Sequence, residues 1–269
     1  MYIQYIYTYM DNKVILICPG GRKKILSIQL LYINKLLDLD IIFEYHIWDF
    51  SWNKEDSDYI SQLHTIHPKI KIKYSPYKNA TRAGKIASQQ FSYFLSEYYK
   101  FETYFDYILV KLDDDISYID ISNFEKFIYG RIKSEAFLYS ANVINNNHLR
   151  GSDFDKLHNE FINNYDNILK KNNLKTSEMF PNTRILSINF VAFLGKDLKY
   201  INKEFSNGDG SNDEWRLCNT IPNALERHNE ICLFMTVVHY AFGGYIDTKY
   251  LDDYIDIANK TISMKIAGP

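Results

Sequence analysis

Cysteine, proline and glycine are scarce in this sequence. Its 269 residues include 3 Cys, 6 Pro and 11 Gly. Three widely spaced cysteines provide neither a disulfide framework nor a metal-binding knuckle. We therefore expect buried, reduced thiols and a cytoplasmic setting.

Long apolar runs and basic tracts are also missing. No apolar run reaches about 18 residues, which is the length that predicts a membrane span. The segment Met1–Met10 has no basic region followed by an apolar core, so we expect no secretory signal. With 31 basic and 33 acidic residues the formal net charge is -2, which disfavours nucleic acid as a partner.

The composition is that of a globular protein. Hydrophobic residues make up 46% and charged residues 24% of the chain, and aromatic residues are abundant, with 23 Tyr and 17 Phe. This length suffices to bury a substantial core. No internal repeat and no linker divides the sequence, so we expect one domain over residues 1–269.

The first half of the chain alternates strand and helix patterns. Apolar runs at 14–18, 41–48, 70–72 and 107–112 predict buried strands, and the segments between them carry helical periodicity, longest at 82–99. Strands that alternate with helices predict the α/β class, with a mostly parallel, Rossmann-like sheet flanked by helices.

The second half is less regular. It contains strand patterns at 136–139, 184–194 and 232–241, and helical patterns at 154–169 and from about Lys249 to the C-terminus. We expect two halves within this domain, about residues 13–115 and about residues 116–269, and the second half to end in a helix packed on the body.

Polar groups follow three of the four predicted strands of the first half. They are Pro19–Arg22, Asp49 and Asp113–Asp115. Ligands of open α/β sheets bind beyond the carboxyl ends of the strands. This position therefore predicts a binding site.

The acidic run Asp113–Asp115 carries the strongest chemical signal. Three neighbouring carboxylates at the end of a buried strand repel one another unless a cation compensates them. Mn²⁺ and Mg²⁺ accept carboxylate oxygens together with substrate phosphate oxygens. In an extended segment Asp113 and Asp115 project to one side, towards a metal, and Asp114 to the other, towards sugar or ribose hydroxyls. The plainer alternative is a solvated acidic turn.

Several further residues are candidates for contacts with a nucleotide. Glycine allows close approach of the backbone, and cationic side chains at a loop or a helix start attract phosphate. The alternatives are an ordinary turn and a solvated helix start. The candidates are Pro19, Gly21, Arg22, Asp49, Asn79, Arg82, Lys85, Asp113 and Asp114.

The second half adds an acidic pair, an amide-rich loop and His239, which lies near the end of an apolar run. Asp213 and Glu214 follow a glycine-rich loop and open a short helix, where carboxylates also serve as plain caps. The loop 142–148 carries amides that suit sugar hydroxyls. Trp48 and Trp215 are candidates for stacking on a base or a sugar, or for the core.

These motifs occur in an order that resembles a known family, the GT-A glycosyltransferases of large DNA viruses and some bacteria, including the chlorella-virus rhamnosyltransferase-type domains. The resemblance is carried by His46–Phe50, Asn53–Asp56, Val110–Ile116, Ala141–Asn146, Asn189–Gly195, Asn212–Trp215 and Val238–Phe242.

The resemblance implies a GT-A fold and a hexosyl or deoxyhexosyl transferase with a nucleotide-sugar donor, most often a UDP-sugar. It also implies that residues 13–115 form the nucleotide-binding half and residues 116–269 the acceptor-side half. The acceptor would be a glycan or glycoprotein hydroxyl, and a viral chain would act in the cytoplasm of its host. By the same resemblance Asp113 and Asp115 bind Mn²⁺ or Mg²⁺, His239 completes the metal shell unless it is a core histidine, and Asp213 or Glu214 is the base of an inverting reaction. The alternatives are a nucleotidyltransferase acting on sugar phosphates and a non-catalytic sugar-binding module.

Overall fold

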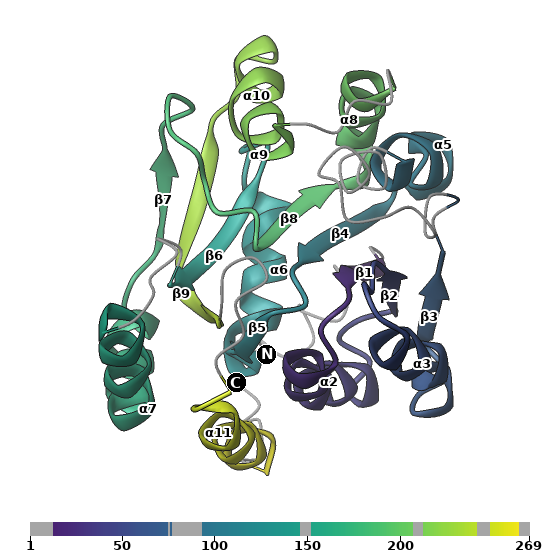
Figure 1. Ribbon diagram of the computed structural model, residues 1–269. Coiled ribbons are helices and arrows are strands. Elements are labelled where there is room, and N and C mark those ends of the chain that lie inside the picture. Colours follow the sequence, from purple (N-terminus) through teal and green to yellow (C-terminus); the bar gives the residue numbers. More distant parts are fainter. Residues whose placement is uncertain are drawn as a thin grey trace, which may run out of the picture.

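The computed structural model describes residues 13–74, 76, 93–145, 152–206, 212–240 and 248–263. Over these residues the chain forms one curved sheet with helices on both faces (Figure 1). The strands are β1 (Lys13–Gly20), β2 (Glu44–Asp49), β3 (Ile70–Lys73), β4 (Tyr107–Leu112), β5 (Ile116–Ile119), β6 (Tyr139–Ile144), β7 (Ser177–Phe180), β8 (Phe190–Leu194) and β9 (Asn229–His239). The helices are α2 (Lys23–Asp38), α3 (Lys54–Gln62), α5 (Phe101–Tyr104), α6 (Phe124–Lys133), α7 (Ser152–Asn173), α8 (Leu198–Phe205), α9 (Asp213–Trp215), α10 (Ile221–Ala224) and α11 (Leu251–Ser263).

The described strands follow the order β3-β2-β1-β4-β8-β6-β9-β5, and β7 pairs with β9 beside this path. The block β3-β2-β1-β4 is parallel, as is the pair β6 and β9. Strand β8 runs antiparallel to both β4 and β6, and β9 is antiparallel to β5 and β7. The predicted α/β class with a helix-flanked sheet is confirmed, and the sheet is mixed beyond β4.

Side chains of the central strands alternate between two hydrophobic clusters, one on each face of the sheet. In β1, Val14 and Leu16 join the cluster that contains α2, whereas Ile15 and Ile17 join the cluster that contains α8. This alternation follows from the period of two along a strand. Because both faces are covered, the central strands are mostly apolar, as parallel strands typically are.

The helices divide between the two faces in the same way. Helices α2, α3, α6, α7 and α11 pack in the first cluster, and α8, α10 and the turn Arg216–Thr220 pack in the second. Helix α11 lies against α2 on one side of the sheet, where both are seen below the strands in Figure 1. The predicted C-terminal helix and its packing on the body are therefore confirmed.

Several element boundaries differ from those expected, most clearly at β8 and β6. The pattern at 184–194 gives a strand only from Phe190 to Leu194, and the pattern at 136–139 gives β6, which runs from Tyr139 to Ile144. Strand β6 therefore includes the start of the amide-rich segment that was expected to be a loop. Residues 82–92 of the expected long helix lie outside the described residues.

The three cysteines, Cys18, Cys218 and Cys232, are buried and unpaired, as expected. Within the described part of the chain, no helix has the length and apolar character needed to cross a bilayer.

Candidate functional site

The acidic run lies where the chain leaves β4 and turns towards β5. Residues Asp113–Asp115, which we call the Asp turn, follow β4, which is the last strand of the parallel block and lies in the middle of the sheet. The backbone of the turn is held from both sides. The Asp113 N–H donates to the carbonyl of Asn189 at 3.0 Å, and the carbonyl of Asp115 accepts from the N–H of Tyr240 at 2.8 Å. The turn thus has a fixed conformation, in which three carboxylates leave the sheet edge.

Asp114 and Asp115 contact the same side chain, Arg22, which lies between β1 and α2. Nε of Arg22 donates to Oδ1 of Asp114 at 2.8 Å, Nη2 donates to the same oxygen, and Nη1 donates to Oδ2 of Asp115 at 2.7 Å. The expectation that Asp113 and Asp115 share one side and Asp114 takes the other is therefore wrong. The strict alternation of an extended strand ends at Leu112, because the next residues form a turn.

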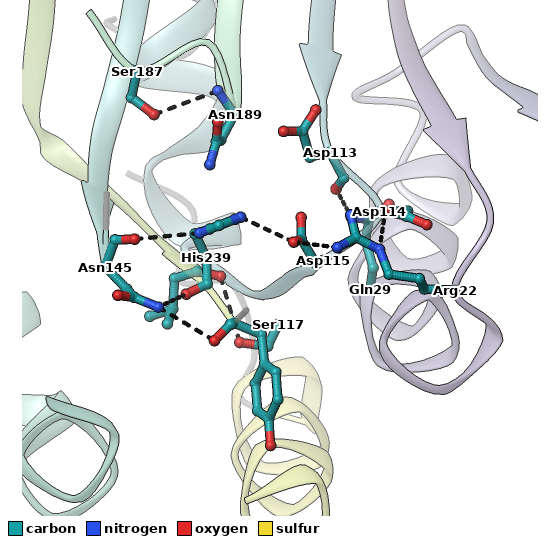
Figure 2. A network of polar contacts seen from close by, with 12 residues as sticks. Arg22, Gln29, Asp113, Asp114, Asp115, Ser117, Asn145, Ser187, Asn189 and His239 are labelled. Carbon is teal, nitrogen blue, oxygen red and sulfur yellow. Dashed lines mark hydrogen bonds and ion pairs between the residues drawn. The ribbon is translucent and has the colours of Figure 1, made fainter. Parts of the chain in front are cut away.

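Figure 2 shows Arg22 approaching the Asp turn from the side of α2, and His239 approaching it from the opposite side. Nε2 of His239 lies 2.9 Å from Oδ2 of Asp115, and both side chains are almost fully buried, with 4% and 2% exposed. The ring comes from the last residue of β9, which pairs with Ile116 at the start of β5. The register between β5 and β9 thus places the histidine beside the carboxylate.

Asn145 fixes the orientation of the imidazole. Its backbone carbonyl lies 3.3 Å from Nδ1 of His239, and its side-chain amide donates to the carbonyl of His239 at 3.0 Å. A carbonyl oxygen can only accept, so Nδ1 carries the hydrogen. Nε2 therefore has two possible states. It is protonated and donates to the carboxylate of Asp115, or it offers its lone pair to a cation that this carboxylate also binds. Metal-binding histidines are oriented by the same kind of hydrogen bond.

The charges of this pair shift both pKa values. Burial alone would lower the pKa of His239, but the charge of Asp115 and the hydrogen bond to it raise the pKa above its ordinary value. Burial alone would raise the pKa of Asp115, but Arg22 and then His239 lower it. The pKa of Asp114 is raised, because its burial outweighs the opposing effect of Arg22.

Lys111 holds the first carboxylate of the Asp turn. Its Nζ lies 2.5 Å from Oδ1 of Asp113 and donates to the carbonyl of Ile188 at 3.0 Å. The ammonium is buried, and burial would lower its pKa, but the charge of Asp113 raises it above the ordinary value. Asp113 is the most accessible of the three carboxylates, with 24% of its side chain exposed.

The acidic pair Asp213 and Glu214 lies on the same face of the sheet as Lys111. Along β4, Leu109 packs in the cluster that contains Leu217, three residues after Glu214, and Lys111 points to this face by alternation. Burial raises the pKa of Asp213, and burial together with the charge of Asp213 raises that of Glu214. Lys111 opposes both shifts.

The structure brings together some of the expected metal ligands. Asp115 and His239 are in direct contact (Figure 2), whereas the carboxylate of Asp113 pairs with Lys111. Over the described residues, no three His, Cys, Asp or Glu side chains gather into a ready-made metal cage. Oδ1 of Asp115 is buried and has no hydrogen-bond partner there. An orphaned carboxylate oxygen beside an oriented imidazole is a donor set that fits a divalent cation, with the remaining ligands left to a substrate.

The other expected nucleotide contacts have different outcomes. Gly21 donates its N–H to Oδ2 of Asp114 at 2.6 Å, and Pro19 lies half-buried in β1. Asp49 is fully buried, and its carboxylate accepts from Ser51 N–H at 3.1 Å, from the Ser51 hydroxyl and from the Ser57 hydroxyl at 2.8 Å. These bonds close the turn after β2.

Some expected residues lie outside the described residues, and the two candidate tryptophans differ in burial. Asn79, Arg82 and Lys85 belong to the first group. Trp48 is a core residue, with 1% exposed, whereas Trp215 is 44% exposed directly after the acidic pair.

The sequence interpretation missed Lys111, Gln29 and the part played by Asn145. The amide of Gln29 is buried in α2 and donates to the carbonyl of Asp113 at 2.7 Å. A lysine inside an apolar strand and a glutamine on the apolar face of a helix were the available signals, since buried polar residues need partners.

No protein-family model and no curated protein sequence matches this chain. Among solved structures, the 2-C-methyl-D-erythritol 4-phosphate cytidylyltransferase (IspD) of Francisella tularensis is similar over 93% of this chain and 100% of that one, at 13% identity and a TM-score of 0.45. The bifunctional glycosyltransferase WbbM is similar over 96% of this chain and 50% of its own, at 9% identity and a TM-score of 0.42. Likenesses of this strength assign neither a family nor an activity to the chain.

Proposed function

We propose that this chain is a metal-dependent glycosyltransferase that moves a sugar from a nucleotide diphosphate sugar to a hydroxyl of a glycan or glycoprotein. The observation that carries the proposal is the contact of 2.9 Å between Nε2 of His239 and Oδ2 of Asp115. Nδ1 of His239 is held by Asn145, and Oδ1 of Asp115 has no hydrogen-bond partner among the described residues. A buried pair of this kind, at the carboxyl edge of a helix-flanked sheet, suits a cation shared with a diphosphate.

In this proposal Asp115 and His239 hold Mn²⁺ or Mg²⁺. When bound, the cation neutralises charge that develops on the leaving diphosphate. Asp113 is the carboxylate best exposed to reach the sugar or ribose hydroxyls of the donor, since Asp114 is buried against Arg22. UDP is the nucleotide that the resemblance of the sequence favours.

Asp213 or Glu214 takes the proton from the acceptor hydroxyl. The acceptor oxygen then attacks the anomeric carbon opposite the diphosphate, the bond to the diphosphate oxygen breaks, and the anomeric centre is inverted. The raised pKa values of both carboxyls support this role, because a base with a pKa closer to neutral binds the proton more effectively in the transition state. A product that retains the donor configuration by NMR would exclude inversion.

The test is to incubate the protein with UDP-, GDP- and dTDP-sugars, Mn²⁺ and an array of simple glycans, and to identify the released nucleotide. Metal-dependent release of a nucleoside diphosphate, lost in Asp115→Asn, supports the proposal. The matched control is Asp58→Asn, which removes an exposed carboxylate on α3 that pairs with Lys54.

Two results would overturn the proposal. Formation of pyrophosphate from a nucleoside triphosphate and a sugar phosphate would indicate a nucleotidyltransferase instead. Neither binding nor turnover of any nucleotide by the folded protein would indicate a non-catalytic module.

A further inference from the structure

Arg22 is an unusual residue for a loop at the edge of a binding site, because its guanidinium is directed at carboxylates of its own chain. All three nitrogens of the guanidinium donate to the Asp turn, two to Asp114 and one to Asp115. The side chain is 17% exposed. The sequence marked Arg22 as a nucleotide ligand, and the geometry gives it a different task.

We propose that Arg22 is a positioning residue that holds the carboxylate of Asp115 in the orientation required for cation binding, and that Asp114 serves to hold Arg22. The inference rests on the proposed function, because it concerns how the proposed cation site is built.

The hydrogen bonds form a series that begins at Gly21 and ends at Asp115. The Gly21 N–H donates to Oδ2 of Asp114 at 2.6 Å, which fixes that carboxylate. Asp114 in turn engages Nε and Nη2 of Arg22, and a guanidinium held at two nitrogens of its planar fork has no freedom to turn. Its remaining nitrogen, Nη1, then meets Oδ2 of Asp115 at 2.7 Å from a fixed direction.

This arrangement determines which oxygen of Asp115 stays open. Arg22 and His239 both approach Oδ2, at 2.7 and 2.9 Å. Oδ1 is buried and has no hydrogen-bond partner among the described residues. Arg22 therefore prevents the carboxylate from rotating to satisfy Oδ1 elsewhere. Residues that orient metal ligands in this way typically change metal affinity by about 10–100-fold when they are removed.

A direct contact between Arg22 and the diphosphate is the rival role, and the two make different predictions. A residue that positions Asp115 changes the affinity for the metal and leaves the metal-free affinity for nucleotide unchanged. A residue that binds the diphosphate changes the metal-free affinity for nucleotide, since its charge acts on phosphate whether or not a cation is present.

The experiment consists of two titrations on each variant. Binding of Mn²⁺ at saturating UDP is followed by EPR, and binding of UDP in EDTA is followed by calorimetry. The variants are Arg22→Met and Arg22→Lys. The matched control is Lys23→Met, because Lys23 is the next residue and its ammonium pairs with the exposed Glu55 at 2.9 Å, away from the Asp turn. The control therefore removes one positive charge from the same helix start without touching Asp115.

We expect Arg22→Met to weaken Mn²⁺ binding by about 10–100-fold and to leave UDP binding in EDTA within about twofold of the wild type. Arg22→Lys should lose nearly as much affinity for Mn²⁺ as Arg22→Met, because one ammonium cannot engage Asp114 and Asp115 as a planar guanidinium does. Lys23→Met should match the wild type in both titrations.

Two outcomes overturn the inference while the proposed function stands. They are unchanged Mn²⁺ binding in Arg22→Met, and a loss of UDP binding in EDTA. Absence of Mn²⁺ binding by the wild type with each of UDP, GDP and dTDP would overturn the proposed function itself. If Arg22→Met does not fold, Asp114→Asn applies the same test: it loosens Arg22 without touching Asp115, so a folded Asp114→Asn variant with unchanged metal affinity also contradicts the inference.

Discussion

Nε2 of His239 lies 2.9 Å from Oδ2 of Asp115, and this contact joins the end of β9 to the turn that follows β4. The ring cannot offer Nδ1 instead, because Nδ1 donates to the carbonyl of Asn145. In the metal-free protein a proton on Nε2 bridges the two residues, and the raised pKa of His239 reflects the charge of Asp115. A metal ion bound here must displace that proton.

The first prediction follows from this competition. Below the raised pKa of His239, binding of Mn²⁺ releases one proton, so the affinity should fall by about tenfold for each unit that the pH is lowered. Above that pKa the affinity should level off. The measurement is an EPR titration of Mn²⁺ at saturating UDP between about pH 5.5 and pH 8, where imidazole groups titrate. An affinity that is constant over this range would contradict the contact between His239 and the cation.

The second prediction concerns the acidic pair and Lys111. A catalytic base must be ionised, and the pKa values of both Asp213 and Glu214 are raised, first of all by burial. Activity should therefore be lost on the acid side at a higher pH than for an ordinary carboxylate. The charge of Lys111 opposes these shifts, so Lys111→Met should move the acid limb of the kcat profile to still higher pH.

The matched control for this profile is Lys54→Met, which removes an exposed ammonium from α3. Its acid limb should coincide with that of the wild type. Glu214→Gln and Asp213→Asn then identify the base, since only the variant that lacks it loses turnover while it still binds nucleotide. If the acid limb of Lys111→Met lies at the same pH as that of the wild type, the charge of Lys111 does not affect the pKa of the base.

The third prediction separates structure from binding at Asp49. Asp49→Ala removes the acceptor for the Ser51 N–H and for the hydroxyls of Ser51 and Ser57. We expect the free energy of unfolding to fall by about 3 kcal/mol, because buried donors lose a charged partner. Nucleotide affinity of the folded variant should match that of the wild type. Denaturant unfolding measures the stability and calorimetry measures the nucleotide affinity. A loss of nucleotide affinity with unchanged stability would indicate instead that Asp49 binds the nucleotide.

Much of the fold was predictable from local patterns. The apolar runs that became β1, β2 and β4 were visible because strands buried on both faces need apolar residues throughout. The placement of the acidic run after β4 followed from the same pattern. The start of β8 at Phe190 was not predictable, since the preceding segment has a similar apolar content but does not pair with a neighbouring strand.

The geometry of the site was predictable only in part. That Asp114 and Asp115 share Arg22 depends on a turn conformation, which the alternation rule for strands does not describe. The contact between Asp115 and His239 depends on the register of β5 and β9, which is a property of the sheet and not of either segment. Lys111 stands out in the sequence only as a lysine within an apolar run, and its partner Asp113 follows from the course of the chain after β4. The position of β4 between β1 and β8 makes Lys111 buried.

The fourth prediction tests the packing of the fold away from the site. A Cβ atom at Gly195 would lie 1.7 Å from the carbonyl oxygen of Tyr104, which is a backbone atom and not the end of a flexible side chain. Gly195→Ala should therefore destabilise the protein by about 3 kcal/mol or more. At Gly130, in α6, the nearest atom is the hydroxyl of the Tyr139 side chain at 2.6 Å. Because a side-chain end can shift and alanine favours a helix, Gly130→Ala should cost less. Equal unfolding free energies for the two variants in denaturant would contradict this packing.

The central claim is that Asp115 and His239 bind a divalent cation together with a nucleotide diphosphate. Its most direct test is the melting temperature of the wild type and of Asp115→Asn with UDP, GDP and dTDP, each with and without Mn²⁺. A ligand that binds only the folded state raises the melting temperature by mass action. The account predicts a shift with one nucleotide that requires Mn²⁺ and disappears in Asp115→Asn. No shift with any nucleotide, or a shift that is the same in the variant, would contradict it.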